Sequence, residues 1–375
     1  MDVDSSPAPC GERLAALDLF RGATVAAMLF VNNPGDWGHL LRPFGHAEWH
    51  GWTPTDLIFP FFLFIVGTSG VLSLEKRRAA GASDRELARH AAVRGMMIVL
   101  VGWAMAWFPF TPERLTRLRI PGVLPRIGAV YLLGTCLVLL FRKRRAWMVL
   151  LAAAVLLSVH TFLLTGLGFD LTREGNVQRF VDLALLKGHL WKRDWDPEGI
   201  VSTLSAVATL LTGTLAGFWL KSDRPLGRRV TGLVLCGLAA AAAGELWGLS
   251  LPVNKNLWTG SYVLLTSGFA AASLGLSILL VDGMGLVKPP GFFYTFGTNP
   301  LLAFVLSGLG TKTLGLVKWA GAGGATTSLH SFLYRGSFGR LPSPVLASHL
   351  WAVAVVVLWY LVLRAFERRG WYWKV

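Results

Sequence analysis

The chain has 375 residues, of which 53% are hydrophobic and only 15% are charged. Soluble domains carry about a quarter charged residues, so this composition argues against a secreted enzyme and against a disordered chain. The formal net charge of +15 would by itself suit a nucleic-acid-binding protein. Sixteen Trp and 22 Phe, with apolar stretches that recur along the chain, instead favour a polytopic membrane protein with basic loops and no nucleic-acid partner.

The apolar stretches predict an all-α bundle of about ten transmembrane helices in one domain, residues 1–375, because one crossing of the bilayer needs about twenty residues. Segment 311–330 is rich in Gly and stays open as a loop, a surface helix or a re-entrant piece. The predicted spans are, in chain order, 14–33, 54–74, 92–110, 122–141, 146–166, 200–220, 230–250, 261–281, 292–310 and 345–364.

Loop charge predicts the orientation of this bundle. Basic residues gather in four segments, and if ten spans cross the membrane in turn, all four segments fall on the same side. The positive-inside rule makes that side cytoplasmic. Both termini and a polar tail, 1–12, are then inside. The other side then carries caps at 34–53, 111–121, 167–199, 251–260 and 311–344. The basic residues are Lys76, Arg77, Arg78, Arg85, Arg89 and Arg94; Arg142, Lys143, Arg144 and Arg145; Lys221, Arg224, Arg228 and Arg229; and Arg368, Arg369 and Lys374.

Cysteine usage points to no special chemistry. Cys10, Cys136 and Cys236 lie far apart, which gives neither a disulfide framework nor a metal-binding spacing.

The first apolar segment contains Asp18 and Arg21 and lacks a small-residue cleavage site. It therefore reads as a retained helix, not a signal peptide.

Charged residues inside a span are costly and are candidates for function. Asp18 and Arg21 are three residues apart and share one helix face. They form either a structural ion pair or a polar lining at the cytoplasmic mouth, where Arg21 meets a phosphate. Arg126 lies near the outer start of the fourth span and needs a carboxylate, a carbonyl or an anionic ligand as its partner. The candidates for a salt bridge are Asp56 and Glu198.

Two polar islands lie between apolar spans. The first, Gly45–Pro60, contains His46, Glu48, His50, Thr53, Thr55 and Asp56. Thr53 or Thr55 suits a helix cap, and Asp56 suits the first turn of the helix. Zinc binding is not predicted, because the metalloprotease pattern needs Glu directly after the first His and Ala47 intervenes.

The second island, Leu251–Ser261, contains Asn254, Lys255, Asn256 and Trp258. Trp258 is either a residue of the interfacial aromatic belt or part of a site. Asn299 precedes Pro300 within the ninth predicted span. The proline leaves backbone carbonyls there without a hydrogen-bond donor, and the Asn299 side chain either donates to them or faces a ligand.

Seven blocks of sequence resemble the heparan-α-glucosaminide N-acetyltransferase family and its bacterial relatives. They occur in the right order and extend over nearly the whole chain. The blocks are LDLFRG (17–22), VNNPG (31–35), HAEWHGWTPTDLIFPFFLFIVG (46–67), RIPGVLPRIG (119–128), DPEG (196–199), LPVNKNLWTGSYVLLTSG (251–268) and FGTNPL (296–301).

The resemblance implies a transmembrane acetyltransferase that takes acetyl-CoA from the cytoplasmic side and acetylates the amine of a glucosamine-type sugar on the far side. It places the proposed catalytic histidine of the family at His46 and the proposed catalytic asparagine at Asn32, and it matches Arg126 to an arginine of the RIPGVLxR block. It further implies a homodimer in a bacterial inner membrane. The family often has Asn where this chain has His50, and bacterial relatives have no heparan sulfate, so the acceptor stays open.

The expected site combines these residues in three roles. His46 acts as the general base for the amine, and Asn32 donates to the thioester oxygen as negative charge develops. Asp56 orients His46 or holds the sugar ammonium. An acetyl-histidine intermediate is the alternative mechanism.

The substrates are expected to bind to two further sets of residues. The expected acceptor-binding residues are Asp56, Trp49, Glu198, Asn254, Lys255 and Trp258. The expected acetyl-CoA-binding residues are Asp18, Arg21, Arg126 and Asn299. No metal is expected.

Three other functions stay open at this stage. O-acetylation of an envelope glycan would use the same base. The polytopic fold, Asn299 and the Asp18–Arg21 pair are also compatible with an amino-sugar transporter, although no internal repeat is evident. A purely structural membrane protein would not need seven polar blocks.

Overall fold

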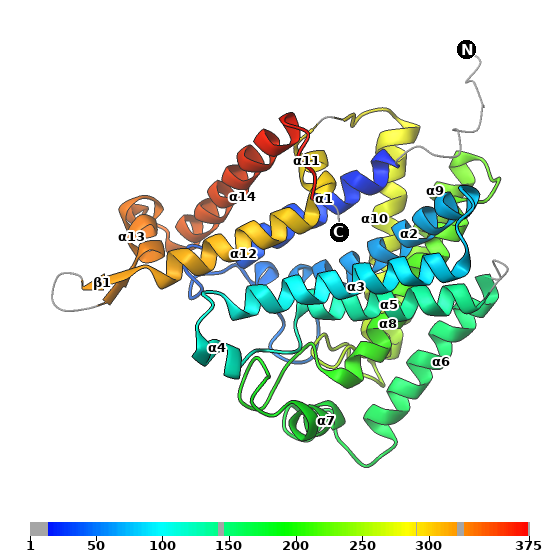
Figure 1. The fold of residues 1–375 in the computed structure, drawn as a ribbon, viewed down its shortest axis with the longest axis horizontal. Coiled ribbons are helices and arrows are strands. Elements are labelled where there is room, and N and C mark those ends of the chain that lie inside the picture. Colours follow the sequence, from blue (N-terminus) through cyan, green and yellow to red (C-terminus); the bar gives the residue numbers. More distant parts are fainter. Residues whose placement is uncertain (1–13, 142–145, 290, 321–325, 374–375) are drawn as a thin grey trace.

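The computed structural model describes residues 14–141, 146–289, 291–320 and 326–373 and consists almost entirely of helices (Figure 1). The long apolar helices are α1 (Ala15–Asn32), α2 (Ile58–Ala79) after the 3-10 turn η2 (Pro54–Leu57), α3 (Asp84–Trp107), α5 (Val123–Leu140), α6 (Ala146–Thr165), α8 (Ile200–Leu220), α9 (Leu226–Gly248), α10 (Gly260–Ile278) with the π-helical turn η3 (Leu279–Gly283), and α14 (Pro344–Arg368). The shorter elements are η1 (Arg42–Phe44), α4 (Pro112–Thr116), α7 (Val177–Leu186), α11 (Phe292–Thr298), α12 (Pro300–Leu316), β1 (Lys318–Ala320), β2 (Thr326–Ser328), α13 (Leu329–Gly336) and η5 (Phe338–Arg340).

The predicted all-α membrane bundle is confirmed. Within the described residues, nine helices are long and apolar enough to cross a bilayer, and each overlaps one of the predicted spans. A hydrocarbon core offers no water to unpaired backbone groups, so continuous helices are the stable form of such segments. The chain is thus an integral membrane protein. The predictions for the tail 1–12, Cys10, Arg142–Arg145 and Lys374 concern positions outside the described residues.

The ninth predicted span, 292–310, is wrong as a single helix. It is divided at Asn299 into α11 and α12, whose axes differ by 92°. Pro300 has no N–H to donate and disfavours helical geometry in the residue before it, and Asn299 accordingly has φ −131° and ψ 51°. The Asn299 side chain donates to the carbonyl of Trp371 (3.2 Å) and accepts from the N–H of Trp373 (3.0 Å), so the break is held by the end of the chain.

The ambiguous segment 311–330 contains three kinds of structure. Helix α12 continues to Leu316, strands β1 and β2 pair antiparallel, and α13 begins at Leu329. This part extends from one end of the molecule beside α14, as Figure 1 shows at the left edge. It is a surface extension and not a further crossing.

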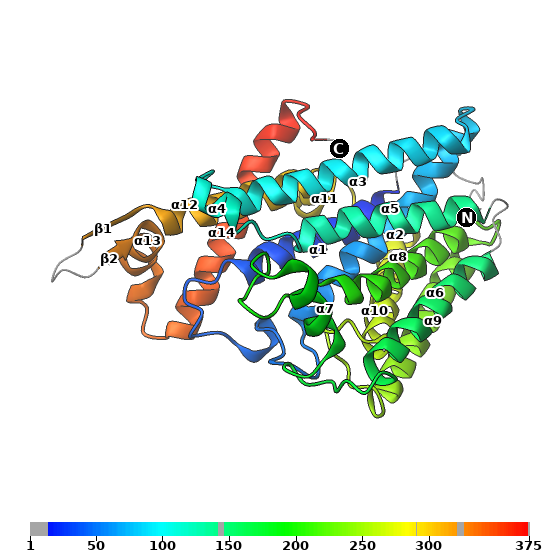
Figure 2. The same ribbon diagram turned by 60° about the horizontal axis from the view of Figure 1, so that its bottom comes forward.

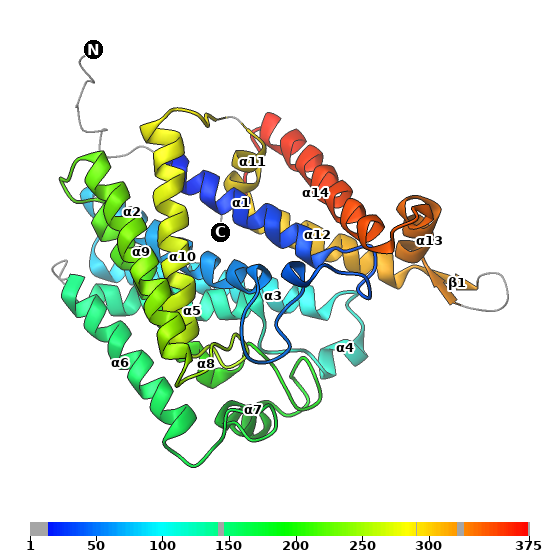
Figure 3. The same ribbon diagram turned by 180° about the vertical axis from the view of Figure 1, so that it is seen from behind.

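Close packing of α2 against α8 determines where the polar start of α2 lies. An ideal Cβ on Gly67 would stand 2.0 Å from the carbonyl oxygen of Leu210, and one on Gly213 would stand 2.0 Å from that of Phe64. Small residues let membrane helices approach to backbone contact in this way. Figure 3 shows α2 and α8 behind α10, which packs closely against α9.

Four of the predicted caps are connected with one another. Segments 34–53, 111–121, 167–199 and 251–260 meet on one side of the bundle, where α7 lies (Figure 2). The hydrogen bonds that join them are Gly51 N–H to Val253 C=O (2.7 Å), Trp49 Nε1 to Leu171 C=O (2.8 Å), Gln178 Nε2 to Asn256 C=O (3.1 Å) and Ile120 N–H to His189 C=O (3.0 Å). We call this assembly the outer cap, after the orientation that loop charge predicts.

Candidate active site

The loop before α2 folds around a buried carboxylate. Asp56 is 1% exposed, and its Oδ2 accepts the backbone N–H groups of Ala47 (3.1 Å) and Thr53 (3.0 Å). The Thr53 hydroxyl donates to the carbonyl of Gly45 (2.6 Å), and Pro54 begins η2 with its preset φ. The cap role predicted for Thr53 and the first-turn position predicted for Asp56 are both found.

His46 lies directly against this carboxylate. Its Nδ1 is 2.7 Å from Asp56 Oδ1, and its ring is half exposed (51%). Because a carboxylate accepts, the tautomer that fits this contact carries the proton on Nδ1 and leaves Nε2 as an acceptor. The expected contact between Asp56 and His46 is present.

Lys255 completes a cluster with these two side chains. Its Nζ lies 3.3 Å from Asp56 Oδ1, 3.0 Å from His46 Nδ1 and 3.4 Å from His46 Nε2. Burial lowers the pKa of Lys255, while the charges of Asp56 and Glu198 act in the opposite direction. The hydroxyl of Tyr262 donates to the backbone carbonyl of Asp56 (2.5 Å). A base, a carboxylate and a cation thus share one corner of the outer cap.

A second charged group lies beside this cluster. Arg119 donates to both carboxylate oxygens of Asp196 (2.8 and 2.7 Å) and also to Glu198. Burial raises the pKa of Glu198. Burial would also raise the pKa of Asp196, but its hydrogen bonds with Arg119 hold that pKa below the usual value. The predicted site omitted Arg119, although it begins the RIPGVLPRIG block, because nothing in the block distinguishes its two arginines.

Arg126 binds a backbone carbonyl, one of the partners predicted for it, and makes no salt bridge with Asp56 or Glu198. It is 3% exposed and donates to the carbonyl of Gly199 (2.9 Å) and to the hydroxyl of Ser202 (2.5 Å). The correction has a geometric cause, because Arg126 points at the start of α8 while Arg119 takes Glu198. Helix α5 therefore uses its arginine to hold the beginning of α8.

The two tryptophans of the predicted site are both in the outer cap. Trp258 is 1% exposed, its indole N–H donates to Thr209 (3.0 Å), and the guanidinium of Arg126 lies 5.1 Å from its ring centre. It is therefore not a residue of the interfacial belt. Trp49 packs edge-on against Trp195, with ring centres 5.0 Å apart.

Asn254 and His50 link the two polar islands. The Asn254 side chain contacts His50 (3.2 Å) and accepts the N–H of Leu257 (2.8 Å). Within residues 14–141, 146–289, 291–320 and 326–373, no three His, Cys, Asp or Glu side chains come together as they would around a metal ion.

Asn32 stands apart from this cluster. It is the last residue of α1, and its exposed side chain makes no hydrogen bond with any residue that the structure describes. Its neighbour Asn33 is buried, donating to the carbonyl of Leu29 (2.7 Å) and accepting from Thr311 (2.5 Å). The structure does not bring Asn32 into contact with His46.

The remaining predicted cofactor residues lie near α11. Arg21 donates to Asp18 (2.8 Å), which confirms the ion pair, and also to the carbonyl of Gly297 (3.2 Å). Asn299, two residues beyond Gly297, holds the end of the chain as described above. Asp18, Arg21 and Asn299 thus gather around one helix, while Arg126 contacts the outer cap.

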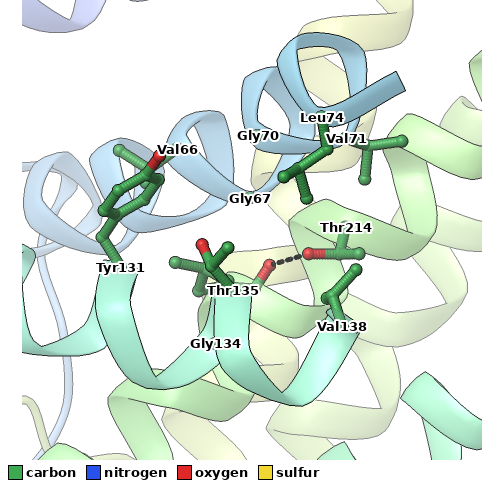
Figure 4. A pocket seen from close by; sticks show the side chains of 11 residues that line it. Val66, Gly67, Gly70, Val71, Leu74, Tyr131, Gly134, Thr135, Val138 and Thr214 are labelled. Carbon is green, nitrogen blue, oxygen red and sulfur yellow. Dashed lines mark hydrogen bonds between the residues drawn. The ribbon is translucent and has the colours of Figure 1, made fainter. Parts of the chain in front are cut away.

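A small, partly open hollow lies between α2, α5 and α8 (Figure 4). Its wall is mostly apolar, with the hydroxyls of Tyr131, Thr135 and Thr214; that of Thr214 donates to the carbonyl of Leu210 (3.2 Å). Gly70 also lines it, and an ideal Cβ there would meet no atom within 4 Å. The hollow as it stands has room for about one water molecule.

Comparison with known proteins connects this geometry to a family. A family model described as "Heparan-alpha-glucosaminide N-acetyltransferase, catalytic" matches residues 13–197. The human heparan-alpha-glucosaminide N-acetyltransferase is 30% identical over 354 residues, covering 78% of this chain and 52% of the human protein. The mouse protein of the same name is 28% identical over 356 residues, covering 78% of this chain and 53% of its own length.

The chain is similar in sequence to the heparan-α-glucosaminide N-acetyltransferases over most of its length. The resemblance inferred from the seven sequence blocks is confirmed, and the chain spans about half the length of these two curated relatives. The matched catalytic range includes His46, Asp56 and Arg119, whereas Lys255 and Trp258 lie beyond it. The candidate site is thus assembled from residues inside and outside the matched range.

Proposed function

We propose that this chain is a transmembrane acetyltransferase that moves the acetyl group of acetyl-CoA to the amine of a glucosamine-type sugar. The observation that carries the proposal is the half-exposed His46 imidazole held 2.7 Å from the buried carboxylate of Asp56. A nitrogen base oriented by a carboxylate is the arrangement that general-base catalysis requires. The relatives bear the name of an N-acetyltransferase, which supports transfer to an amine.

His46 is the proposed general base. The sugar ammonium first loses one proton to solvent. The free amine then attacks the thioester carbon, a C–N bond forms, and a second amine proton passes to His46 Nε2. The C–S bond then breaks, and the CoA thiolate leaves and takes the proton from the imidazolium as free thiol. Asp56 stabilises the imidazolium during this step, because its oxygen already accepts the Nδ1 proton.

The acceptor is proposed to bind in the outer cap around this base. Trp49 supplies a half-buried aromatic edge, Glu198 supplies a carboxylate for a sugar ammonium, and Asn254 and Trp258 shape the wall. Asn32 keeps its proposed role as a donor to the thioester oxygen from the end of α1. Direct attack is preferred to an acetyl-histidine intermediate, because the exposed ring leaves room for both substrates.

The donor is proposed to enter from the cytoplasmic side of a bacterial inner membrane, with both termini inside. Arg21 and the neighbouring Asp18 and Asn299 would lie near the CoA phosphates. The pantetheine arm would pass between α2, α5 and α8 beside Gly70, where the small hollow would have to widen. The hollow begins at Val66, ten residues after Asp56, and one helical residue rises 1.5 Å, so the distance along α2 is roughly 15 Å. An extended arm spans that length. A homodimer is the proposed assembly.

The test is thiol release from acetyl-CoA by the purified protein in detergent, with and without glucosamine. We expect glucosamine-dependent release that disappears in the His46→Ala variant while acetyl-CoA binding persists. The matched control is His39→Ala, because His39 Nδ1 lies 2.8 Å from Asp36 Oδ2 in a similar but solvent-exposed pair. That variant should retain transfer.

Three other results would count against the proposal. Transfer that survives in His46→Ala would remove the assigned base. Release that needs an envelope glycan, but not glucosamine, would indicate O-acetylation. Uptake of labelled glucosamine into proteoliposomes without acetyl-CoA would indicate a transporter.

A further inference from the structure

A buried cation lies next to the proposed base. Lys255 Nζ is 3.4 Å from His46 Nε2, the atom that would take the amine proton, and 3.3 Å from Asp56 Oδ1. The side chain is 17% exposed, so the ammonium is partly open to a bound substrate. A lysine ammonium has three N–H donors. Here it lies within hydrogen-bond distance of Asp56 Oδ1 and of both His46 nitrogens, and a ligand oxygen would replace its contact with His46.

The backbone around Lys255 fixes this cation in place. The fully buried Asn254 accepts the N–H of Leu257 (2.8 Å), and its own N–H donates to Thr259 (3.0 Å). Trp258 has φ +54°, a left-handed conformation that a bulky residue adopts only where the surroundings enforce it. The turn is further joined to the His46 loop through the Gly51 N–H. The cation is thus held by a scaffold, not by a free surface loop.

Electrostatics argue against the acceptor-binding role that the sequence predicted for Lys255. A glucosamine acceptor arrives as an ammonium, and two cations about 4 Å apart repel each other. A group that becomes negative during the reaction would instead be attracted. In the acetyl transfer, that group is the thioester oxygen, which carries the charge of the tetrahedral intermediate.

We propose that Lys255 is a catalytic residue whose ammonium stabilises the oxyanion of the tetrahedral intermediate. This inference rests on the proposed function. As the amine nitrogen bonds to the acyl carbon, the C=O electron pair moves to oxygen and Lys255 Nζ donates a hydrogen bond to it. When the C–S bond breaks, the pair returns to form the C=O bond, so Lys255 ends the cycle unchanged.

Bond lengths allow this arrangement. An amine nitrogen that donates to His46 Nε2 lies about 3 Å from it, and the carbonyl oxygen lies two covalent bonds further on. Since Lys255 Nζ is itself 3.4 Å from Nε2, an oxygen on that side falls within about 3 Å of Nζ, the range of oxyanion donors. Asn32, the donor proposed above, makes no hydrogen bond with His46 among the described residues, so Lys255 is the donor that lies directly against the base, and Asn32 would add to it from the end of α1.

The test compares Lys255→Met and Lys255→Arg in glucosamine-dependent thiol release across pH. We expect Lys255→Met to lower the pH-independent plateau of kcat by roughly 10²–10³-fold, the cost of removing one oxyanion donor. The KM for glucosamine and the acetyl-CoA affinity should change little. Lys255→Arg should restore part of the loss. Lys192→Met, a change at an exposed lysine of the same cap, is the matched control.

Each other outcome overturns the inference in a recognisable way. A raised KM with unchanged kcat would assign Lys255 to acceptor binding. A pH profile that only moves, with an unchanged plateau, would make it a residue that adjusts His46. If Lys255→Met fails to fold, the neutral donor Lys255→Gln takes its place, and full activity there would reject a cationic role.

A second readout separates this inference from the proposed function. Slow hydrolysis of acetyl-CoA without a sugar passes through an oxyanion at the same carbon. If glucosamine is not acetylated but hydrolysis falls in Lys255→Met, the acceptor is wrong and the role of Lys255 stands. If wild type and variant hydrolyse acetyl-CoA equally, the role of Lys255 is rejected whatever the acceptor.

Discussion

Asp56 Oδ1 lies 2.7 Å from His46 Nδ1, although His46 belongs to a loop and Asp56 to the turn that begins the second membrane segment. The other oxygen of Asp56 accepts two backbone N–H groups, from Ala47 and Thr53. The carboxylate cannot rotate without breaking these bonds. It therefore fixes both the direction and the tautomer of the imidazole.

Asp56→Asn should lower kcat by roughly 10²–10⁴-fold, the range of general acid–base catalysis, because an amide cannot stabilise the imidazolium. Steady-state thiol release at several pH values measures this effect. Glu48→Gln is the control, since Glu48 is an exposed carboxylate two residues from His46. Equal losses in both variants would mean that the loop, and not the pair, is sensitive.

Gly70→Leu should weaken acetyl-CoA binding roughly tenfold, a change of about 1.4 kcal/mol. Gly70 lines the hollow between α2, α5 and α8, and a side chain there meets open space, so the helix should keep its stability (Figure 4). Isothermal titration in detergent measures the affinity. Gly227→Leu, at another open position, should change neither affinity nor melting temperature. Unchanged binding in Gly70→Leu would place the CoA arm elsewhere.

Arg119→Met should destabilise the protein by about 3 kcal/mol, because removal of one partner leaves buried carboxylates uncompensated. Asp196 is fully buried and takes both bonds of the Arg119 fork, and Glu198 shares the same guanidinium. Thermal unfolding in detergent measures the loss, and the exposed Arg117→Met is the control. If the double variant with Asp196→Asn is no more stable than Arg119→Met, the uncompensated charge is not the cause.

Asp182 should make folding stability fall as pH rises. Burial raises the pKa of Asp182 from 3.8 to about 6, so the folded state binds this proton more tightly than the unfolded state. The stabilisation from the bound proton is complete below pH 3.8 and is lost as pH rises to about 6. Asp182→Asn should flatten this part of the profile, because its oxygen can still accept the N–H of Ile200.

Melting temperatures between pH 4 and pH 7 test this dependence. Asp223→Asn, at an exposed loop position, should show the wild-type slope. A wild-type slope in Asp182→Asn would assign the pH dependence to another group.

Much of the fold follows from the amino-acid sequence alone, because hydropathy is a local property and a membrane-spanning segment must satisfy its backbone hydrogen bonds within itself. Nine predicted spans therefore agree with nine long apolar helices in the part of the chain that the structure describes. The contact between His46 and Asp56 was also predictable, since only ten residues separate them and Thr53 and Pro54 mark the helix start between them. The resemblance of the seven sequence blocks to a family supplied the expectation of acetyl transfer.

Only the tertiary structure decided which distant groups meet. Arg119, and not Arg126, takes Glu198, because the direction in which α5 enters the bundle points Arg126 at the start of α8. Lys255 reaches His46 across 209 positions of sequence, since a buried turn in one cap segment pairs with a loop in another. Such contacts depend on how helices and caps pack in three dimensions, and no local pattern of residues encodes that packing.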